Sequence, residues 1–233
     1  MIDIHSHIVF SVDDGSKSLE QSIKYLNEIK SIGMSNVICT PHVKHGEASK
    51  LEKIIKHFNV LKEEANKLGI NLYLGNEIMY TEKTIDLLNN HQLLTLNGTK
   101  YILVEFKRDD QRDDDDIISI FERLIEAGYK PIWAHPELYA FHRDIELVRK
   151  VRSLGVIIQI DSTSLLPNEY FNIYLYAHKL LKNYLVDMVA SDSHCSKKRS
   201  FKTMAKAYKH VRRKYGDYAS IIFGENQKNI IGG

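Results

Sequence analysis

The 233-residue sequence has few of the residues that mark secreted, fibrous or membrane proteins. Its two cysteines, Cys39 and Cys195, are too few for a disulfide framework, which favours a reducing compartment. No apolar run reaches the roughly 18 residues of a membrane span, and Asp3 stands where a signal peptide would be basic. With 12 glycines and 4 prolines there is little material for a linker. We therefore expect one cytoplasmic domain over residues 1–233.

The sequence also lacks a large excess of positive or negative charge. The 32 lysines and arginines nearly cancel the 30 aspartates and glutamates, so the overall field gives no reason to expect a nucleic acid or an anionic membrane as partner. The basic side chains between Lys206 and Lys214 are most simply the solvated face of a last helix. The sequence therefore predicts no nucleic-acid partner and no membrane insertion.

Short apolar runs alternate with amphipathic helical patterns along the whole chain. Strands are expected at residues 2–4, 36–40, 71–75, 101–106, 131–134, 156–160 and 186–190. Helices are expected at residues 19–32, 51–68, 84–89, 117–125, 145–154, 170–181 and 202–215. Seven βα units of this kind indicate an α/β fold with a parallel sheet, open or closed, and we favour a barrel.

Polar side chains follow these strands where they end. Eight of them are histidines, aspartates and glutamates: His5, His7, His42, Glu77, Glu105, His135, Asp192 and His194. In parallel α/β folds the carboxyl ends of the strands meet at one crevice, so residues far apart in sequence can share a site. A single buried histidine is more often a core residue than a ligand. Together, however, these groups would be costly to bury unless cations neutralised them.

The donor types indicate which cations would suit the site. Imidazole nitrogens and carboxylate oxygens without thiolates favour Mn, Fe or Zn in an open, catalytic centre over a closed structural zinc site. The sequence therefore predicts a polynuclear metal centre in a hydrolytic enzyme.

Several short motifs occur in a fixed order. They are Asp3-Ile4-His5-Ser6-His7, Val12-Asp13-Asp14-Gly15, Thr40-Pro41-His42, Glu77-Ile78, Val104-Glu105-Phe106, Ala134-His135-Pro136-Glu137 and Ala190-Ser191-Asp192-Ser193-His194. In this order they resemble the polymerase and histidinol phosphatase (PHP) superfamily. Within it, the sequence is most similar to the manganese-dependent protein-tyrosine phosphatases of bacterial capsule and exopolysaccharide operons. The resemblance implies a distorted (β/α)7 TIM-like barrel, the PHP fold.

The same resemblance implies three divalent metal ions, most simply Mn, with Fe or Zn as alternatives. The first would bind His5, His7, Asp192 and a bridging Glu77, and the second Glu77, Glu105 and His135. The third would bind Asp14, His42 and His194. Asp13 competes with Asp14 for this last place, and the family position favours Asp14.

The resemblance also implies the activity. A metal-bound water would attack phosphotyrosine on the tail of a bacterial tyrosine kinase that regulates capsular or exopolysaccharide synthesis. Arg199 stands where relatives carry a phosphate-binding arginine. Leu138 replaces a second arginine of those relatives, and Lys44 or Arg143 could substitute for it.

Three other interpretations of these residues compete with the phosphatase. A small-molecule phosphomonoesterase of the histidinol-phosphate type would use the same ligands, although the short chain favours an open pocket for a peptide. A non-catalytic domain would have lost ligands, whereas all nine positions are filled. A cysteine nucleophile is disfavoured, because the segment from Cys195 to Arg199 is too short for that signature and contains no glycine to open a phosphate-binding loop.

Overall fold

The computed structural model describes residues 1–43, 48–107, 112–139, 145–167, 170–196 and 199–232. The strands are β1 (Ile2–Asp3), β2 (Asn36–Cys39), β3 (Asn71–Leu74), β4 (Glu77–Met79), β5 (Tyr101–Glu105), β6 (Lys130–Ala134), β7 (Ile157–Asp161) and β8 (Met188–Ala190). The longer helices are α1 (Leu19–Ser31), α2 (Ala48–Lys67), α3 (Thr84–Asn89), α4 (Asp114–Glu126), α5 (Ile145–Ser153), α6 (Phe171–Lys182) and α7 (Lys202–Tyr215). Lys44 and Arg143 lie outside the described residues.

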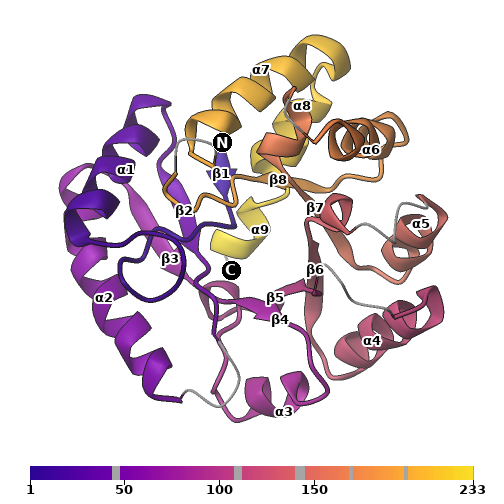
Figure 1. Cartoon of the computed structure of the whole chain (residues 1–233), viewed down its shortest axis with the longest axis horizontal. Helices are drawn as coiled ribbons and strands as arrows, with labels where there is room; N and C mark the ends of the chain where they lie inside the picture. The colour runs from indigo at the N-terminus through magenta and orange to yellow at the C-terminus, as the bar shows by residue number, and fades with distance from the viewer. Residues whose placement is uncertain (44–47, 108–111, 140–144, 168–169, 197–198, 233) are drawn as a thin grey trace.

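All neighbouring strands pair in parallel. One sheet has the order β1-β2-β3, and the other has the order β4-β5-β6-β7-β8. Two isolated parallel bridges, Ser6 with Ser193 and His42 with Glu77, connect the sheets at the ends where the strands finish. Figure 1 shows the strands around a common centre with α1 to α7 outside them. This is a mixed α/β fold with parallel sheets, as the alternating pattern predicts.

The structure adds two features that the sequence pattern did not reveal. Strand β4 begins three residues after β3 and was not expected as a separate strand. The chain also ends in short helical turns, α8 (Tyr218–Ser220), η4 (Ile221–Glu225) and α9 (Lys228–Ile231). In Figure 1, α9 and the C-terminus lie near the centre of the ring of strands.

Local signals explain where the helices begin. The Ser18 hydroxyl accepts a hydrogen bond from the backbone of Gln21 at 3.2 Å, which caps α1. Asp113 caps α4 in the same way through the backbone of Asp116, at 2.9 Å. Acidic side chains in the first turn of α4 complement the positive end of the helix dipole.

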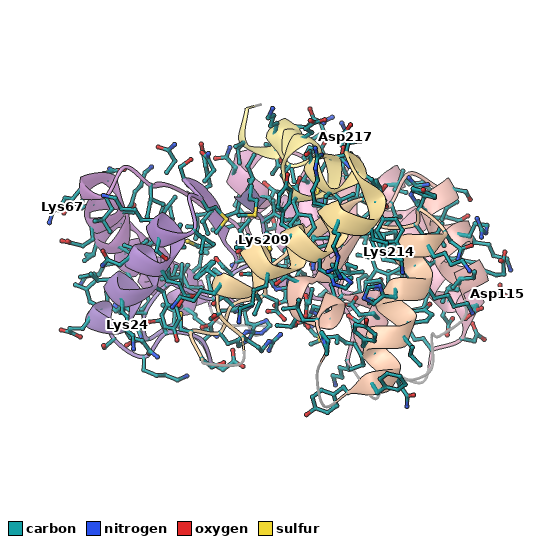
Figure 2. All side chains as sticks on the ribbon, turned by 90° about the horizontal axis from the view of Figure 1, so that it is seen from above. Lys24, Lys67, Asp115, Lys209, Lys214 and Asp217 are labelled. Carbon is teal, nitrogen blue, oxygen red and sulfur yellow. The ribbon has the colours of Figure 1, made fainter. Side chains whose placement is uncertain are left out.

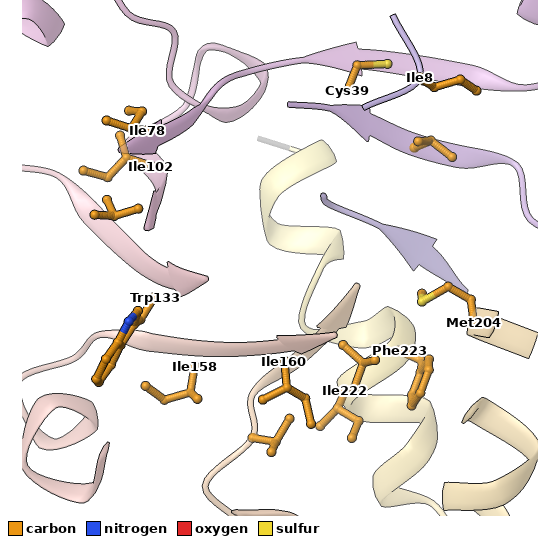
Figure 3. Packing of buried hydrophobic residues seen from close by; sticks show 14 of the residues in the cluster. Ile8, Cys39, Ile78, Ile102, Trp133, Ile158, Ile160, Met204, Ile222 and Phe223 are labelled. Atoms are coloured by element: carbon orange, nitrogen blue, oxygen red, sulfur yellow. The ribbon is translucent and has the colours of Figure 1, made fainter. Parts of the chain in front are cut away.

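The apolar side chains form two clusters. The larger fills the space between strands and helices, and Figure 3 shows part of it, including Trp133 of β6, Ile158 of β7 and Phe223 of η4. The smaller lies among the strands and contains Ile2, Ile4, Ile38, Leu96, Leu103, Ile132, Ala134, Met188, Ala190 and Ile230. Through Ile230, helix α9 therefore packs against side chains from both sheets.

The outer faces of the helices carry charge. Figure 2 shows Lys67 of α2 and Asp115 of α4 at opposite edges of the molecule, and Lys209 of α7 is also exposed. In the described part of the chain, no helix combines the length and the hydropathy that crossing a membrane would need.

Candidate metal centre

The residues expected to share a site are brought together at the ends of the strands. Three overlapping groups place their ligand atoms within 4.8 Å of one another: His5, His7, Glu77 and Asp192; His42, Glu77 and Glu105; and His7, Asp14, His42 and His194. They lie in and around an open cavity of about 760 Å³. Most of these side chains converge because they come at or just after the end of a parallel strand, whereas Asp14 lies in the loop between β1 and α1 and Glu77 is the first residue of β4.

The first group has two imidazoles facing two carboxylates. His5 Nε2 lies 3.0 Å from Glu77 Oε2 and 3.4 Å from Asp192 Oδ1. His7 Nε2 lies 3.1 Å and 3.5 Å from these same two oxygens. All four side chains are at most 2% exposed. Four donor atoms thus converge on one point, and they belong to the residues expected at the first cation.

The second group shares Glu77 with the first group. His42 Nδ1 is 3.3 Å from Glu77 Oε2 and 3.2 Å from Glu105 Oε1. His135 Nε2 is 2.8 Å from Glu77 Oε1 and 3.8 Å from Glu105 Oε2. His135 therefore reaches both carboxylates expected beside it, and His42 faces the same pair. Glu77 touches imidazoles with both oxygens, which is the arrangement a bridging ligand needs.

The third group is nearer to solvent. Asp14 Oδ1 lies 3.4 Å from His194 Nε2 and 3.8 Å from His42 Nε2, and the Asp14 side chain is 67% exposed. The His194 ring stacks on His7 with centroids 4.1 Å apart. Asp14, His42 and His194 are thus neighbours, as expected, at the mouth of the cavity.

Asp13 has a different position from its neighbour Asp14. Its side chain is 2% exposed, and Oδ2 lies 2.7 Å from His7 Nδ1 and accepts from the backbone of His42 at 3.1 Å. The backbone of Gly15 donates to Oδ1 at 2.9 Å. A Cβ on Gly15 would lie 2.0 Å from the His7 carbonyl oxygen, so only glycine fits there. Asp13 thus orients His7, while Asp14 points toward the cavity.

The backbone is unusual at three residues of the centre. His135 has φ 36° and ψ 52°, Asp192 has φ 45°, and Cys195 has φ 54°. Left-handed conformations of this kind cost free energy for residues other than glycine and persist where surrounding structure enforces them. They frequently mark functional sites, and here two of the three are expected ligands.

In the metal-free centre, the pairing of imidazoles with carboxylates shifts the pKa values of both. Burial disfavours the charged form of His7, but its hydrogen bonds to Asp13 and Glu77 outweigh burial and raise its pKa to about 10. Burial and the Glu77 hydrogen bond compete in the same way at His135, whose pKa is raised to about 9. Burial opposes ionisation of Glu77, yet the surrounding histidines hold its pKa well below the usual value. The centre therefore favours anionic carboxylates beside cations.

The donor set fits metal ions. His5 Nδ1 faces the amide oxygen of Gln159 at 3.0 Å and His7 Nδ1 faces Asp13, so each ring can turn an Nε2 lone pair inward. Those two Nε2 atoms lie only 3.4 Å apart. The buried Glu105 Oε1 and Asp192 Oδ1 form no hydrogen bond within the described chain, although His42 Nδ1 and His194 Nδ1 each lie 3.2 Å from one of them. Imidazole nitrogens crowded against buried carboxylates can share a bound cation, and these N and O donors suit Mn, Fe or Zn.

Arg199 lines the cavity and forms an ion pair with Asp192. Its Nη2 also lies 3.9 Å from Asp161 Oδ2. The described residues that line the cavity include Lys50 of α2 but not Leu138. Sequence reasoning singled out Arg199 and did not consider Lys50, because a lysine in a helix gives no signal of its own.

Sequence reasoning also assigned no role to three buried polar residues behind the centre. Gln159 and Asp161 lie on β7, and Glu137 follows His135 in a short helical turn. Burial, reinforced by the charge of Asp161, raises the pKa of Glu137 to about 8. A polar residue inside an apolar run, as in Val156-Ile157-Ile158-Gln159-Ile160-Asp161, was the available signal.

Comparison with known proteins finds relatives along almost the whole chain. The family described as capsular polysaccharide synthesis, CpsB/CapC, matches residues 1–232. Tyrosine-protein phosphatase CpsB from Streptococcus agalactiae is 36% identical over 99% of this chain and 98% of its own length. Tyrosine-protein phosphatase YwqE from Bacillus subtilis is 31% identical over 99% of this chain and 91% of its own length.

Solved structures also include a tyrosine phosphatase of similar fold. A crystal structure from work on YwqE of Bacillus subtilis and CpsB of Streptococcus pneumoniae, described as unique metal-dependent tyrosine phosphatases, aligns with a TM-score of 0.83 and 27% identity. The alignment covers 100% of this chain and 94% of that one. An organophosphorus hydrolase from Deinococcus radiodurans aligns with a TM-score of 0.59 at 12% identity, which is a likeness of fold alone. This chain belongs to the CpsB/CapC family.

Proposed function

We propose that this chain is a metal-dependent protein-tyrosine phosphatase that hydrolyses phosphotyrosine on the tail of a bacterial tyrosine kinase regulating capsular or exopolysaccharide synthesis. The observation that carries the proposal is the convergence of the nine expected histidines, aspartates and glutamates with Arg199 around one open cavity. The names of the relatives support the reaction, since CpsB and YwqE are tyrosine-protein phosphatases.

The proposal includes three divalent ions, most simply Mn. His5, His7, Glu77 and Asp192 would hold one, and Glu77, Glu105 and His135 a second. Asp14, His42 and His194 would hold the third. Bound ions of this kind supply Lewis acidity, which acidifies water and offsets the negative charge of a phosphoryl group. The chain supplies the rigid carboxylates and imidazoles that set the spacing of those ions.

Arg199 is proposed to bind the phosphoryl oxygens. Its guanidinium lies at the cavity wall and already contacts a carboxylate, Asp192. A guanidinium presents two parallel donors to an oxyanion, a geometry that suits phosphate as well as carboxylate. In the proposed reaction Arg199 holds the phosphoryl group in line for displacement, and its charge stabilises the negative charge on the equatorial oxygens.

The rest of the cavity suits a tyrosine side chain. Val12, Val43, Met79 and Phe106 contribute apolar wall, and the volume of about 760 Å³ is ample for one aromatic side chain. A phenol has a pKa near 10, so it leaves more readily than an alkyl alcohol and needs less help from a general acid. The open cavity is thus compatible with a tyrosine presented on an extended peptide.

Three broader expectations belong to the same proposal. Residues 1–233 are proposed to form one domain, in which the two sheets act as a distorted (β/α)7 barrel. Two observations support the barrel. The bridges Ser6 to Ser193 and His42 to Glu77 connect the two sheets, and side chains from both sheets cluster with Ile230 of α9. The protein is proposed to act in the cytoplasm, where Cys39 and Cys195 would stay reduced; both are buried free thiols.

The test is steady-state hydrolysis of a phosphotyrosine peptide panel and of histidinol phosphate, with and without Mn. We expect Mn-dependent activity on the peptides to exceed that on the small ester. Arg199→Ala should lower kcat/KM by roughly ten- to a hundredfold, since a charge-assisted contact contributes about 1.5 to 3 kcal/mol. Arg212→Ala is the matched control, because Arg212 of α7 pairs with Asp217 outside the cavity. Preference for histidinol phosphate would favour the small-molecule alternative.

A further inference from the structure

A chain of buried polar side chains leads from the candidate metal centre along β7 to Arg199. His5 Nδ1 lies 3.0 Å from Gln159 Oε1, and Gln159 Nε2 donates to Asp161 Oδ1 at 3.1 Å. The other oxygen of Asp161 lies 3.9 Å from Arg199 Nη2. Gln159 is 0% exposed and Asp161 is 1% exposed. Both side chains lie on one face of β7, because residues two apart in a strand point the same way.

The hydrogen bonds of this chain fix the direction of each group. An ionised carboxylate only accepts, so Asp161 requires the NH2 end of the Gln159 amide to face it. The carbonyl end of Gln159 must then face His5. Since that oxygen also only accepts, His5 Nδ1 must carry a proton, and Nε2, which faces Glu77 and Asp192, is the nitrogen left to bind a metal.

Asp161 also lies close to the Arg199 guanidinium. In the described structure, the carboxylates within 4.0 Å of the Arg199 guanidinium are Asp192 and Asp161. Asp192 is an expected metal ligand, whereas Asp161 belongs to none of the groups whose atoms converge on a common point. Asp161 is therefore the anchor of Arg199 that does not compete for a metal.

We propose that Asp161 is a positioning residue with two arms. Through Gln159 it sets the tautomer and orientation of His5, and directly it holds Arg199 at the cavity wall. The His5 arm predicts an effect on metal affinity, and the Arg199 arm predicts an effect on phosphate binding. The second arm rests on the function proposed above, while the first can be tested without any substrate.

The backbone around Asp161 explains why its carboxylate is held still. The Asp161 N–H donates to Glu137 Oε1 at 2.8 Å, and Glu137 is 1% exposed. Burying a charged carboxylate beside another acid is costly, and an apolar pair on β7 would pack without that cost. The retained polar pair is consistent with orienting partners of metal-binding histidines, whose loss typically weakens metal affinity about ten- to a hundredfold.

The first experiment measures Mn binding by calorimetry on chelator-treated protein. Gln159→Met keeps the size of the side chain but removes both hydrogen bonds, and we expect at least one Mn-binding step to weaken about tenfold or more. Gln227→Met is the matched control. Gln227 is also fully buried, and its Nε2 donates to the Ile222 carbonyl at 2.6 Å, away from the cavity. It should lower Tm without changing the Kd for Mn.

A double-mutant cycle separates positioning from general loss of stability. If Asp161 reaches His5 through Gln159, Asp161→Ala weakens Mn binding in the wild-type background and adds less than about twofold in the Gln159→Met background. A merely structural role would make the two losses additive. Additive effects, or a wild-type Kd for Mn in Gln159→Met, would overturn the His5 arm.

Asp161→Asn separates the two arms. The asparagine oxygen can still accept from Gln159, so the Kd for Mn should stay within about twofold of wild type. The charge that holds Arg199 is lost, so the inhibition constant of inorganic phosphate at saturating Mn should rise several-fold. An unchanged constant would overturn the Arg199 arm. Absence of tyrosine phosphatase activity in the wild type would instead refute the proposed function and leave the Mn measurements interpretable.

Discussion

The two ends of the strands differ in what they bury. Where the strands finish, the buried side chains include His5, Glu77 and Asp192, and His5 contacts both carboxylates. At the opposite end, Ile2, Met188 and other apolar side chains pack with Ile230 of α9. Both ends contain fully buried side chains, since Ile230 and His5 are each 0% exposed. The same parallel frame therefore supports two kinds of interior.

The difference assigns separate tasks to the two ends. Burial of apolar surface stabilises the fold by about 25 cal/mol per Å². Burial of charged groups costs free energy unless each is paired, which makes the polar end dependent on protons or cations. Variants at the polar end should consequently change metal binding and catalysis, and variants at the apolar end should change stability.

The largest effect is expected from Glu77→Ala. Because Glu77 touches imidazoles through both oxygens, its loss should remove more than one equivalent of bound metal and lower kcat to below about a thousandth of wild type, roughly 4 kcal/mol. Metal analysis and phosphopeptide kinetics measure both. Glu82→Ala is the control, since Glu82 is exposed and pairs with Arg123. Loss of one equivalent or none would refute the bridging role.

A stability effect without a catalytic effect is expected from Ile230→Ala at the apolar end. Truncating this fully buried side chain should lower the free energy of unfolding by about 2 to 4 kcal/mol. The folded variant should keep its Kd for Mn and its kcat. Ile221→Ala, at a position 39% exposed, should cost less than about 1 kcal/mol. Urea denaturation checks the ranking, and a large fall in kcat for Ile230→Ala would break the separation.

The polar end should make stability depend on pH in opposite ways with and without metal. In metal-free protein the pKa values of His7 and His135 are raised to about 10 and about 9, above the ordinary value near 6.5. Their stabilising contribution is thus complete below pH about 6.5 and is lost as the pH rises through 9 to 10. Metal binding displaces these protons, so the gain in Tm caused by Mn should grow over the same range.

Calorimetric scans at several pH values between 6 and about 9.5, with chelator or with Mn, measure both trends. An aspartate variant far from the cavity, Asp217→Asn on the surface, should leave the two trends unchanged. A chelated protein whose Tm rises over this range would contradict the assignment of His7 and His135 as proton-binding groups.

The smallest effect is expected from thiol reagents. Cys39 and Cys195 are buried, and burial raises the pKa of Cys195 to about 12, so neither thiol is poised as a nucleophile. Iodoacetamide applied to native protein should leave activity within about twofold of the untreated enzyme, whereas a chelator should abolish it and Mn restore it. Mass spectrometry of native and unfolded samples reports the extent of alkylation. Inactivation that follows alkylation of Cys195 would contradict the metal mechanism.

The sequence predicted the polar end better than the apolar end. Strand ends were recognisable because histidines and acids follow short apolar runs, so His5, His42 and Asp192 could be grouped without coordinates. Helix α9 was missed, since its four residues have too little periodicity to distinguish them from a loop. Strand β4 was missed because it is short and begins almost directly after β3.

The residues that orient the candidate ligands were missed for a physical reason. Gln159 meets His5 across 154 positions of sequence, and Asp161 approaches Arg199 only because β7 and β8 are neighbours. Such contacts depend on strand register, which a single sequence does not reveal. Asp13 and Asp14 could likewise be separated only by family position until their side-chain directions were known.

If the polar end of the strands hydrolyses phosphotyrosine with bound metal ions, titrating chelator-treated protein with Mn should restore the hydrolysis of a phosphotyrosine peptide. We expect negligible activity without metal and a rise that levels off only when three equivalents are bound. Full activity in the presence of chelator, or a plateau reached with a single equivalent, would contradict this expectation.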